Sequence, residues 1–322
     1  MKPVLAVSMG DPAGIGPEIV AAASRDPRVE RACSIVLFGD ASVVQAAACG
    51  GGRRSQGGRA RMDIEAVTEG LAARGRPRPG RRAGEAAFRY LDAAARAVAA
   101  GRYDALVTAP INKYWMSRAG HDYDGHTGYL SELSGCSATM MLAGRRLRVV
   151  LVTTHLALSA VPGKITGERI RTAAHTTVQH LREYHSLARP RLAVAALNPH
   201  AGENGLFGTE EKRIIAPAIR GLRRARMRVE GPFPADTLFA AGATDDYDAV
   251  LCMYHDQALI PLKLLEFGRA VNVTMGLPFV RTSPDHGTAY ELAGTGKARA
   301  DSMIEALLAA ASMVRNRRRK KS

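Results

Sequence analysis

The sequence has few cysteines, few aromatic residues and no long apolar run. Its 322 residues include four cysteines, and no two of them form a Cys-x-x-Cys pair: Cys33, Cys49, Cys136 and Cys252. Neither a disulfide framework nor a thiolate zinc site is indicated, so a reducing compartment is expected. No run approaches the roughly 18 apolar residues of a membrane span, and PVLAVSMG follows Met1 without a leader pattern. These absences predict a cytoplasmic protein with no membrane contact.

Acidic residues are also scarce, since 30 Asp and Glu face 45 Lys and Arg for a net charge of +15. Such an excess raises the question of a nucleic-acid partner. Six of the basic residues lie within residues 315–322, nine arginines lie within residues 53–82, and aromatic residues make up only 5% of the chain. Single-strand binding needs aromatic residues between the basic ones. We therefore expect no nucleic-acid partner, and a basic binding protein is the non-enzymatic alternative. An anionic small substrate would also suit the positive field.

Short apolar runs alternate with longer segments of helical periodicity. The runs predict buried strands at residues 4–8, 34–38, 105–108, 149–153, 192–196 and 249–253. Apolar residues recur at helical spacing in residues 85–100 and 168–184. This alternation predicts the α/β class, with a parallel sheet covered on both faces, and the length is typical of two domains. Residues 50–84 are dense in Gly, Arg and Pro and predict a mobile connection.

Three histidines each follow one of the predicted strands. LRVVLVTTH ends at His155, RLAVAALNPH ends at His200, and YDAVLCMYH ends at His255. Ligands bind at the carboxyl ends of strands in open α/β sheets. If the three strands are neighbours, the imidazoles converge and form a catalytic site for a divalent ion. The alternative is that each histidine caps its own strand by hydrogen bonding, and a three-histidine zinc site could also belong to a hydrolase.

Two aspartates accompany these histidines. Asp256 follows His255 directly, and Asp236 lies in the Pro-rich segment GPFPADTLF. Carboxylates beside a metal can orient its imidazole ligands, ligate the ion or accept a proton from a bound hydroxyl. A helix cap or a loop hydrogen bond is the alternative role for each.

Three polar residues interrupt an otherwise apolar stretch at nine-residue intervals: Lys263, Asn272 and Arg281. Buried cations need an anionic partner. A phosphate or carboxylate of the substrate would supply it, and ion pairs with Glu266 or Asp285 are the alternative.

Two glycine-containing segments could receive a cofactor. MGDPAGIGPE covers residues 9–18, and PDHGTAYELAG covers residues 284–294. Neither carries the GxGxxG or Walker pattern, but a Gly-rich turn before a helix can still bind an anion or a cofactor edge. Two further polar turns, TAPINK at residues 108–113 and GHT at residues 125–127, are not specific by themselves.

Together these motifs resemble one family. In this order, MGDPAGIGPE, TAPINK, GHT, TTHLAL, NPHAGENG, GPFPADTLF, MYHDQALIPLK and GLPFVRTSPDHGTAYELAG resemble the 4-hydroxythreonine-4-phosphate dehydrogenase family of vitamin B6 biosynthesis. The resemblance implies an isocitrate/isopropylmalate dehydrogenase-like fold of two α/β/α domains with mainly parallel sheets. Residues 1–125 plus 283–322 would form the cofactor domain, residues 126–282 the metal and substrate domain, and the active site would lie in the cleft between them. It also implies NAD or NADP, a divalent ion (zinc, magnesium or cobalt) and a homodimer with a shared active site.

The resemblance also assigns roles to positions of this sequence. The implied metal ligands are three histidines: His155, His200 and His255. The implied substrate contacts lie in two segments: His126 and Thr127, and, on the phosphate side, Lys263, Asn272 and Arg281. The implied adenosine-binding loop contains three small or polar residues: His286, Gly287 and Thr288.

The implied reaction oxidises 4-phosphooxy-L-threonine to a 3-keto acid, which loses carbon dioxide to give 3-amino-2-oxopropyl phosphate. Asp236 or Asp256 would be the base. One position departs from the family, which usually reads GHTE where this chain has Gly128 in GHTGYL. The missing carboxylate leaves open a related dehydrogenase that acts on 4-phosphoerythronate or 4-phosphothreonate, or on an aromatic cis-dihydrodiol.

Overall fold

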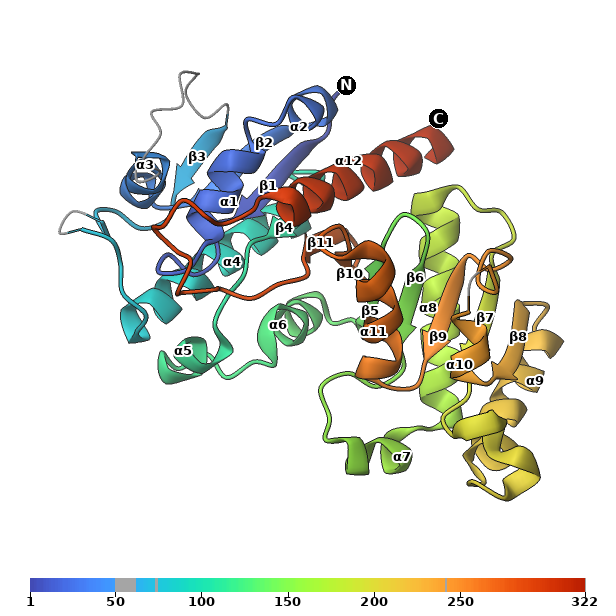
Figure 1. Ribbon diagram of the computed structural model, residues 1–322. Helices are drawn as coiled ribbons and strands as arrows, with labels where there is room; N and C mark the ends of the chain where they lie inside the picture. The colour runs from blue at the N-terminus through green and yellow to red at the C-terminus, as the bar shows by residue number, and fades with distance from the viewer. Residues whose placement is uncertain (50–61, 73–74, 241, 322) are drawn as a thin grey trace. The chain divides into compact units, whose positions relative to one another are not determined.

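The computed structural model describes residues 1–49, 62–72, 75–240 and 242–321 (Figure 1). The chain divides into two compact units. Unit 1 contains Met1–Ala138 and Val271–Arg319, and unit 2 contains Thr139–Ala270 and Lys320–Ser322.

The unit boundaries differ from the predicted domain boundaries after residues 125 and 282. Residues 126–138 and 271–282 belong to unit 1. As a result, His126, Asn272 and Arg281 share a unit with the predicted cofactor segments rather than with the three histidines.

The sheet of unit 1 has the strand order β3-β2-β1-β4-β11-β10. Its strands are β1 (Val4–Ser8), β2 (Ser34–Gly39), β3 (Asp63–Ala66), β4 (Ala105–Thr108), β10 (Val271–Met275) and β11 (Val280–Pro284). Neighbouring strands are parallel except for the antiparallel pair β10–β11. The residues of β1 and β4 are almost all buried, as expected for parallel strands covered on both faces.

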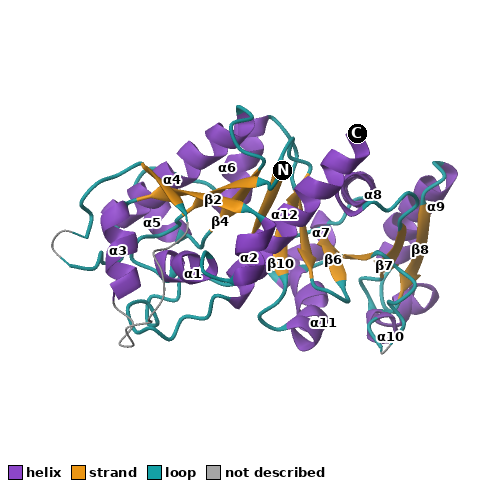
Figure 2. Cartoon of the chain, turned by 90° about the horizontal axis from the view of Figure 1, so that it is seen from above, coloured by secondary structure: helices purple, strands orange, loops and turns teal. Residues whose placement is uncertain are grey.

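Helices cover both faces of this sheet. They are α1 (Gly16–Ala23), α2 (Pro27–Ala32), α3 (Ala41–Cys49), α4 (Arg81–Ala99), α5 (Lys113–Arg118), α6 (Gly125–Ser134) and α12 (Asp301–Lys321). Figure 2 shows α4 on one side of the strands and α1 and α12 on the other. Helix α4 buries a stripe that includes Tyr90, Leu91 and Ala94, which is the pattern of an amphipathic helix packed on a sheet.

Unit 2 has the strand order β5-β6-β9-β7-β8. Its strands are β5 (Thr139–Ala143), β6 (Arg148–Leu151), β7 (Arg191–Ala195), β8 (Arg228–Phe233) and β9 (Ala249–Cys252). Only the hairpin β5–β6 is antiparallel. The α-helices are α7 (Val161–Lys164), α8 (Gly167–His185), α9 (Ala216–Arg224), α10 (Ala235–Leu238) and α11 (His255–Glu266), and shorter turns are η1 (Leu158–Ala160), η2 (Pro199–Gly205) and η3 (Glu211–Ile215). Helices α8 and α11 lie on opposite faces of the central strands (Figure 2).

The predicted α/β class and the six predicted strands are confirmed, with ends that shift by one or two residues. The two predicted helices correspond to α4 and α8. Of the predicted mobile connection, residues 50–61 and 73–74 lie outside the described residues, whereas β3 and the start of α4 occupy part of the remainder. No helix in the described ranges combines the length and apolar character that crossing a membrane requires.

Candidate active site

The three strands that precede the candidate metal ligands are neighbours in unit 2. Strand β9 pairs in parallel with β6 on one side and with β7 on the other. His155 follows β6, His200 lies in η2 after β7, and His255 is the first residue of α11 after β9. The condition on which the predicted metal site depends is therefore met.

The structure brings two of these three imidazoles together. The ring centroids of His155 and His255 are 5.6 Å apart. His255 is half-buried, and His155 and His200 are exposed. The backbone turns through left-handed conformations from His200, at φ +50°, to Asn204. Among the described residues, no three His, Cys, Asp or Glu side chains are close enough to hold one ion. The assignment of His200 as the third ligand therefore stays a prediction.

The pair of imidazoles suits a divalent ion. Asp256 Oδ1 lies 2.7 Å from His255 Nδ1, so the other ring nitrogen, Nε2, remains available to an ion. A carboxylate on the second ring nitrogen is the usual way in which a metal-binding histidine is oriented. Asp256 therefore supports the ring of His255, and a role as base would need it to leave this contact.

Asp236 is the other candidate base of unit 2. It is an exposed residue of α10, the short helix that follows β8 at the edge of the sheet. Among the described residues, its carboxylate does not belong to a group of three or more His, Cys, Asp or Glu side chains that could hold an ion. Its role as base stays a prediction.

A buried glutamate, which the sequence analysis missed, fixes the segment that leads to His200. Glu211 is 5% exposed, and its Oε1 accepts the backbone N–H groups of Leu197 and Asn198, each at 2.8 Å. The Asn198 side chain donates to Oε2 at 3.0 Å. Nothing in the pattern TEEK marks this glutamate as buried, because its partners precede it by 13 and 14 residues.

Unit 1 contains a buried cation. Arg281 is 2% exposed, and its guanidinium donates to Thr274 Oγ1 at 2.8 Å and to Thr108 Oγ1 at 2.6 Å. The buried Nε has no hydrogen-bond partner. Among the residues that the structure describes, no carboxylate pairs with Arg281, so the predicted alternative of an ion pair with Glu266 or Asp285 is wrong for this residue. The two threonines were not recognised from the sequence.

Among the other buried polar atoms without partners in the same unit are two that belong to predicted substrate contacts: His126 Nε2 and Asn272 Oδ1. Asn272 and Thr274 share one face of β10, and Ser283, which pairs with Asn272 across β11, shares that face with Arg281. His126 is in the first turn of α6. Unpaired buried polar groups are rare and mark positions where a ligand or water binds. We call Arg281, His126 and Asn272 the polar cradle.

Burial changes the proton affinities in this cradle. Desolvation lowers the pKa of Arg281 to about 9. Desolvation, followed by the charges of Arg281 and Lys113, lowers the pKa of His126 well below its ordinary value of 6.5, against a hydrogen bond with the backbone of Ala109. At neutral pH the cradle therefore holds one cation and a neutral imidazole, which suits an anionic ligand that also carries hydrogen-bonding groups.

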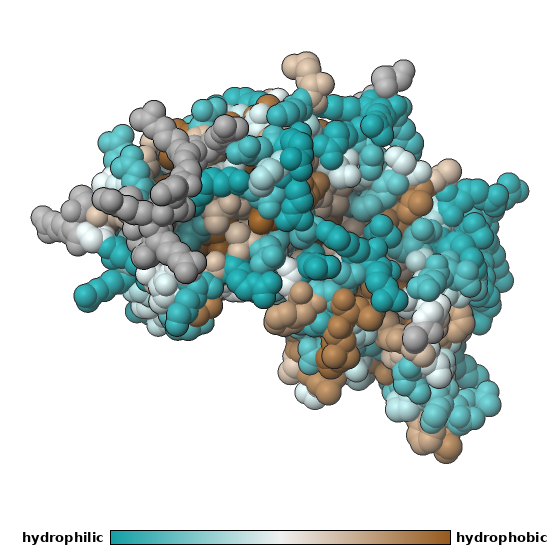
Figure 3. All heavy atoms as spheres, turned by 45° about the horizontal axis from the view of Figure 1, so that its top comes forward, coloured by the Kyte–Doolittle hydropathy of each residue, from teal (hydrophilic) through white to brown (hydrophobic). Residues whose placement is uncertain are grey.

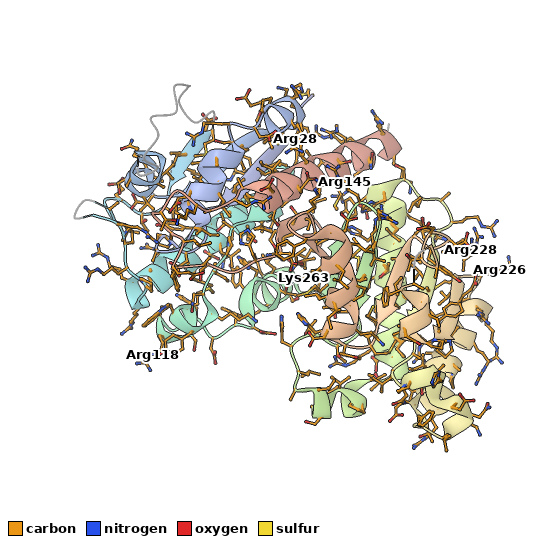
Figure 4. The ribbon with its side chains drawn as sticks, in the orientation of Figure 1. Arg28, Arg118, Arg145, Arg226, Arg228 and Lys263 are labelled. Carbon is orange, nitrogen blue, oxygen red and sulfur yellow. The ribbon has the colours of Figure 1, made fainter. Side chains whose placement is uncertain are left out.

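The other predicted substrate contacts are Thr127 and Lys263. Thr127 follows His126 and is half-buried. Lys263 is an exposed residue of α11 in unit 2 (Figure 4). The nine-residue spacing therefore does not place Lys263 in the same unit as Asn272 and Arg281. Lys113 Nζ lies 2.5 Å from Asp124 Oδ1, so TAPINK and the turn before GHT meet through an ion pair.

The two predicted cofactor segments are joined in unit 1. The amide of Ile15 donates to Thr288 O at 2.9 Å, and the Tyr290 hydroxyl donates to Asp11 Oδ2 at 2.5 Å. Asp11 is fully buried, and burial raises the pKa of its carboxyl against the hydrogen bonds of Tyr290 and Ala13. Asp11 and Tyr290 thus fasten the Gly-rich turn to the second loop, and neither was predicted.

Two of the three predicted adenosine-binding residues lie at the surface of that loop. His286 and Gly287 are exposed, and Thr288 is buried. Gly14 has no room for a Cβ, which would lie 2.8 Å from Thr288 O. The close approach of the two backbones therefore depends on glycine at this position.

Comparisons with known proteins agree with this architecture. The family model of the pyridoxal phosphate biosynthetic protein PdxA matches residues 31–310. A 4-hydroxythreonine-4-phosphate dehydrogenase of Geobacter metallireducens is 46% identical over 98% of this chain and 96% of its own. The crystal structure of the enzyme with that name from Klebsiella pneumoniae has a TM-score of 0.85 at 38% identity and covers 97% of this chain and 100% of its own. A terephthalate 1,2-cis-dihydrodiol dehydrogenase from Burkholderia xenovorans has a TM-score of 0.67 at 30% identity, covering 97% and 98%.

Fold and site define a two-unit α/β protein whose polar groups gather at the ends of mostly parallel strands. The matches extend over nearly the whole length of the chain and of its relatives. The chain belongs to the family of the pyridoxal phosphate biosynthetic protein PdxA.

Proposed function

We propose that this chain is a metal-dependent, NAD(P)-linked 4-hydroxythreonine-4-phosphate dehydrogenase. The buried, unpaired guanidinium of Arg281 carries the proposal, because a cation that is 2% exposed needs an anion to complete it. A substrate phosphate supplies that anion and binds planar guanidinium N–H groups well. The names of the relatives point to the same class of substrate.

The remaining groups of the polar cradle fit the rest of such a substrate. Neutral His126 donates to the backbone of Ala109 through its other ring nitrogen, so Nε2 can accept one hydrogen bond, and Asn272 Oδ1 accepts one. These unpaired atoms would bind and orient the substrate next to the phosphate. Lys263 of unit 2 is proposed as a further contact on the phosphate side, and Thr127 as a contact beside His126.

His155 and His255 would hold the divalent ion, with His200 as the third ligand. The ion, whether zinc, magnesium or cobalt, would lower the pKa of the substrate hydroxyl so that it loses its proton near neutral pH. Asp236, an exposed carboxylate without a described partner, is the better candidate to receive that proton, because Asp256 is engaged by His255.

The joined segments of residues 9–18 and 284–294 would bind the dinucleotide through His286, Gly287 and Thr288. NAD or NADP would accept the hydride from the carbinol carbon. The 3-keto acid that results would lose carbon dioxide to give 3-amino-2-oxopropyl phosphate.

We also propose that the protein is a homodimer with a shared active site. Three residues of one face of α11 and its end are strongly exposed: Ile260 at 60%, Leu264 at 82% and Phe267 at 82%. Figure 3 shows hydrophobic side chains gathered over this part of the molecule. A contiguous exposed apolar patch is typical of an interface, and a twofold axis would pair the patch with itself. The Leu264→Asp variant should then be monomeric in light scattering, whereas Tyr114→Asp, at a residue 62% exposed in unit 1, should stay dimeric.

A cytoplasmic location completes the proposal. Of the cysteines whose side chains the structure describes, none is in a disulfide, and Cys33 and Cys252 are buried. This use of cysteine suits a reducing compartment.

The second candidate is a dehydrogenase of a related substrate. Gly128 lies in the first turn of α6 beside His126 and Thr127, and one relative is named as a cis-dihydrodiol dehydrogenase. The deciding assay follows nicotinamide reduction with 4-phosphooxy-L-threonine, 4-phosphoerythronate and a cis-dihydrodiol, each with and without a chelator. We expect rapid, chelator-sensitive turnover of 4-phosphooxy-L-threonine. Preference for either of the other two substrates would contradict the proposed substrate. Hydrolysis without nicotinamide reduction would contradict the proposed oxidation.

A further inference from the structure

One arginine in the loop before α4 contacts both glycine turns of the proposed cofactor site. Arg76 Nη2 donates to Ala13 O at 2.5 Å. Its Nη1 lies 2.8 Å from the position that a Cβ on Gly294 would occupy, so the guanidinium lies against the bare backbone of that turn. Arg76 therefore bridges residues 9–18 and residues 284–294.

The charge of Arg76 is not neutralised by the protein. Within the described ranges no carboxylate lies within salt-bridge distance of it. The two acids of this turn are engaged elsewhere, since Glu18 Oε1 accepts the amide of Gly294 and Asp11 accepts the amide of Ala13 and the hydroxyl of Tyr290. Arg76 is also exposed, so a ligand can reach the N–H groups that Ala13 does not use.

The neighbouring backbone favours an anion at the same place. The turn of residues 9–18 leads into the N-terminus of α1, where Pro17 has no amide and the amide of Ile15 is used by Thr288 O, which leaves the amides of Gly16 and Glu18 without an intrahelical partner. A guanidinium has five donors in a planar fork that matches a phosphate, and only one of its groups is used by Ala13 O. Because the side chain is already held on the turn by Ala13 O, binding costs less conformational entropy.

We infer that Arg76 binds a phosphate group of the dinucleotide and so determines cofactor affinity. This inference rests on the proposed function, because it takes the joined turns to be the dinucleotide site. The phosphate is either the pyrophosphate, which NAD and NADP share, or the adenosine 2′-phosphate, which only NADP carries.

Binding of NADH and NADPH to the purified full-length chain, followed by nicotinamide fluorescence without substrate, tests the inference. Arg76→Ala removes both charge and hydrogen bond, Arg76→Gln keeps a donor without charge, and Arg76→Lys keeps charge without the fork. Arg78→Ala is the matched control, since Arg78 is an exposed residue of the same loop. Circular dichroism and thermal unfolding verify that each variant is folded.

We expect Arg76→Ala and Arg76→Gln to weaken binding by about tenfold or more, with a smaller loss in Arg76→Lys and none in Arg78→Ala. The salt dependence of binding should decrease in the uncharged variants, which a merely structural role of the Ala13 contact would not produce. A loss confined to NADPH assigns the 2′-phosphate, and an equal loss for both assigns the pyrophosphate.

Two negative results are distinguishable. If the unmodified chain binds both dinucleotides and Arg76→Ala binds them equally well, the role of Arg76 is wrong and the proposed function stands. If the unmodified chain binds neither, the proposed function fails, and the role of Arg76 fails with it.

Discussion

The two units hold their functional groups in opposite ways. In unit 1, Arg281 is 2% exposed and is fixed by threonines of β4 and β10 before any ligand arrives. In unit 2, His155 and His200 are exposed and follow strands in loops or short turns. Unit 1 therefore presents a buried cation, and unit 2 presents exposed candidate ligands after the ends of its strands.

The difference suits what each group is proposed to bind. A buried guanidinium is unfavourable by itself, so the strands around it must be stable enough to hold it in place. Imidazoles can remain in water until an ion arrives, because the ion itself supplies the energy that orders them. We therefore expect changes in unit 1 to affect substrate affinity, and changes in unit 2 to affect metal affinity.

The largest effect should come from His255→Ala in unit 2. Loss of a ligand should reduce metal content and kcat/KM on the order of 10³-fold, beyond the roughly 10–100-fold typical of an outer partner. Asp256→Asn should show that smaller loss, because Asp256 would act through the ring of His255, whose Nδ1 lies 2.7 Å from Asp256 Oδ1. Metal content by mass spectrometry and activity during metal titration measure both. His175→Ala, at an exposed histidine of α8, is the control and should behave like the unmodified chain.

Arg281→Met in unit 1 should affect the substrate and spare the fold. We expect KM for the phosphorylated substrate to rise, with a loss in kcat/KM of about a hundredfold or more, because at least two charge-assisted hydrogen bonds are removed. Stability should be unchanged or higher, since a buried unpaired cation is replaced by an apolar side chain of similar length. Steady-state kinetics and urea unfolding measure the two effects. An unchanged KM would remove Arg281 from the substrate site.

The parts of the molecule that could be predicted are those with a local signal. Buried parallel strands are continuous apolar runs, so β1, β4 and β9 are evident in the sequence. His155 and His255 could be found because residues after such strands share one edge of the sheet.

The rest depends on contacts between distant residues. Arg281 meets Thr108 across 173 positions, and Tyr290 meets Asp11 across 279. No regular spacing in the sequence predicts these hydrogen bonds. The equal intervals of Lys263, Asn272 and Arg281 predicted one cluster. The chain passes from unit 2 to unit 1 at Val271, so Lys263 belongs to unit 2 and the other two residues belong to unit 1.

Not all histidines of unit 2 are exposed. His180 of α8 is 5% exposed, its Nε2 has no partner, and desolvation, then the charges of His185 and Arg148, lower its pKa to about 3. Below its ordinary pKa of 6.5 the unfolded chain binds a proton that the folded chain cannot, so stability falls as pH decreases from about 6.5 toward 3. His180→Leu should lessen the decrease in unfolding free energy between about pH 7 and pH 5 by about 2 kcal/mol.

The matched control for this experiment is His175→Leu on the exposed side of the same helix. It should leave the slope of unfolding free energy against pH as it is. Equal slopes for His180→Leu and the unmodified chain would mean that the imidazole of His180 takes up a proton in the folded state. The buried histidine of unit 2 would then be protonated in the folded chain, unlike His126 of the polar cradle, whose pKa is lowered well below 6.5.

The smallest effect should come from Gly128→Glu in α6 of unit 1. A Cβ there would lie 3.8 Å from that of Asp124, so a side chain fits. Replacing a helical glycine should raise the unfolding free energy by roughly 0.5–1 kcal/mol, and the added carboxylate, which the resembled family carries at this position, should lower KM for 4-phosphooxy-L-threonine a few-fold, on the order of 1 kcal/mol. Gly128→Gln should give the same stability without the change in KM. If both variants change KM equally, the size of the side chain at position 128 determines KM rather than its charge. Arg281 would then be the only tested residue of unit 1 that acts on the substrate through its charge.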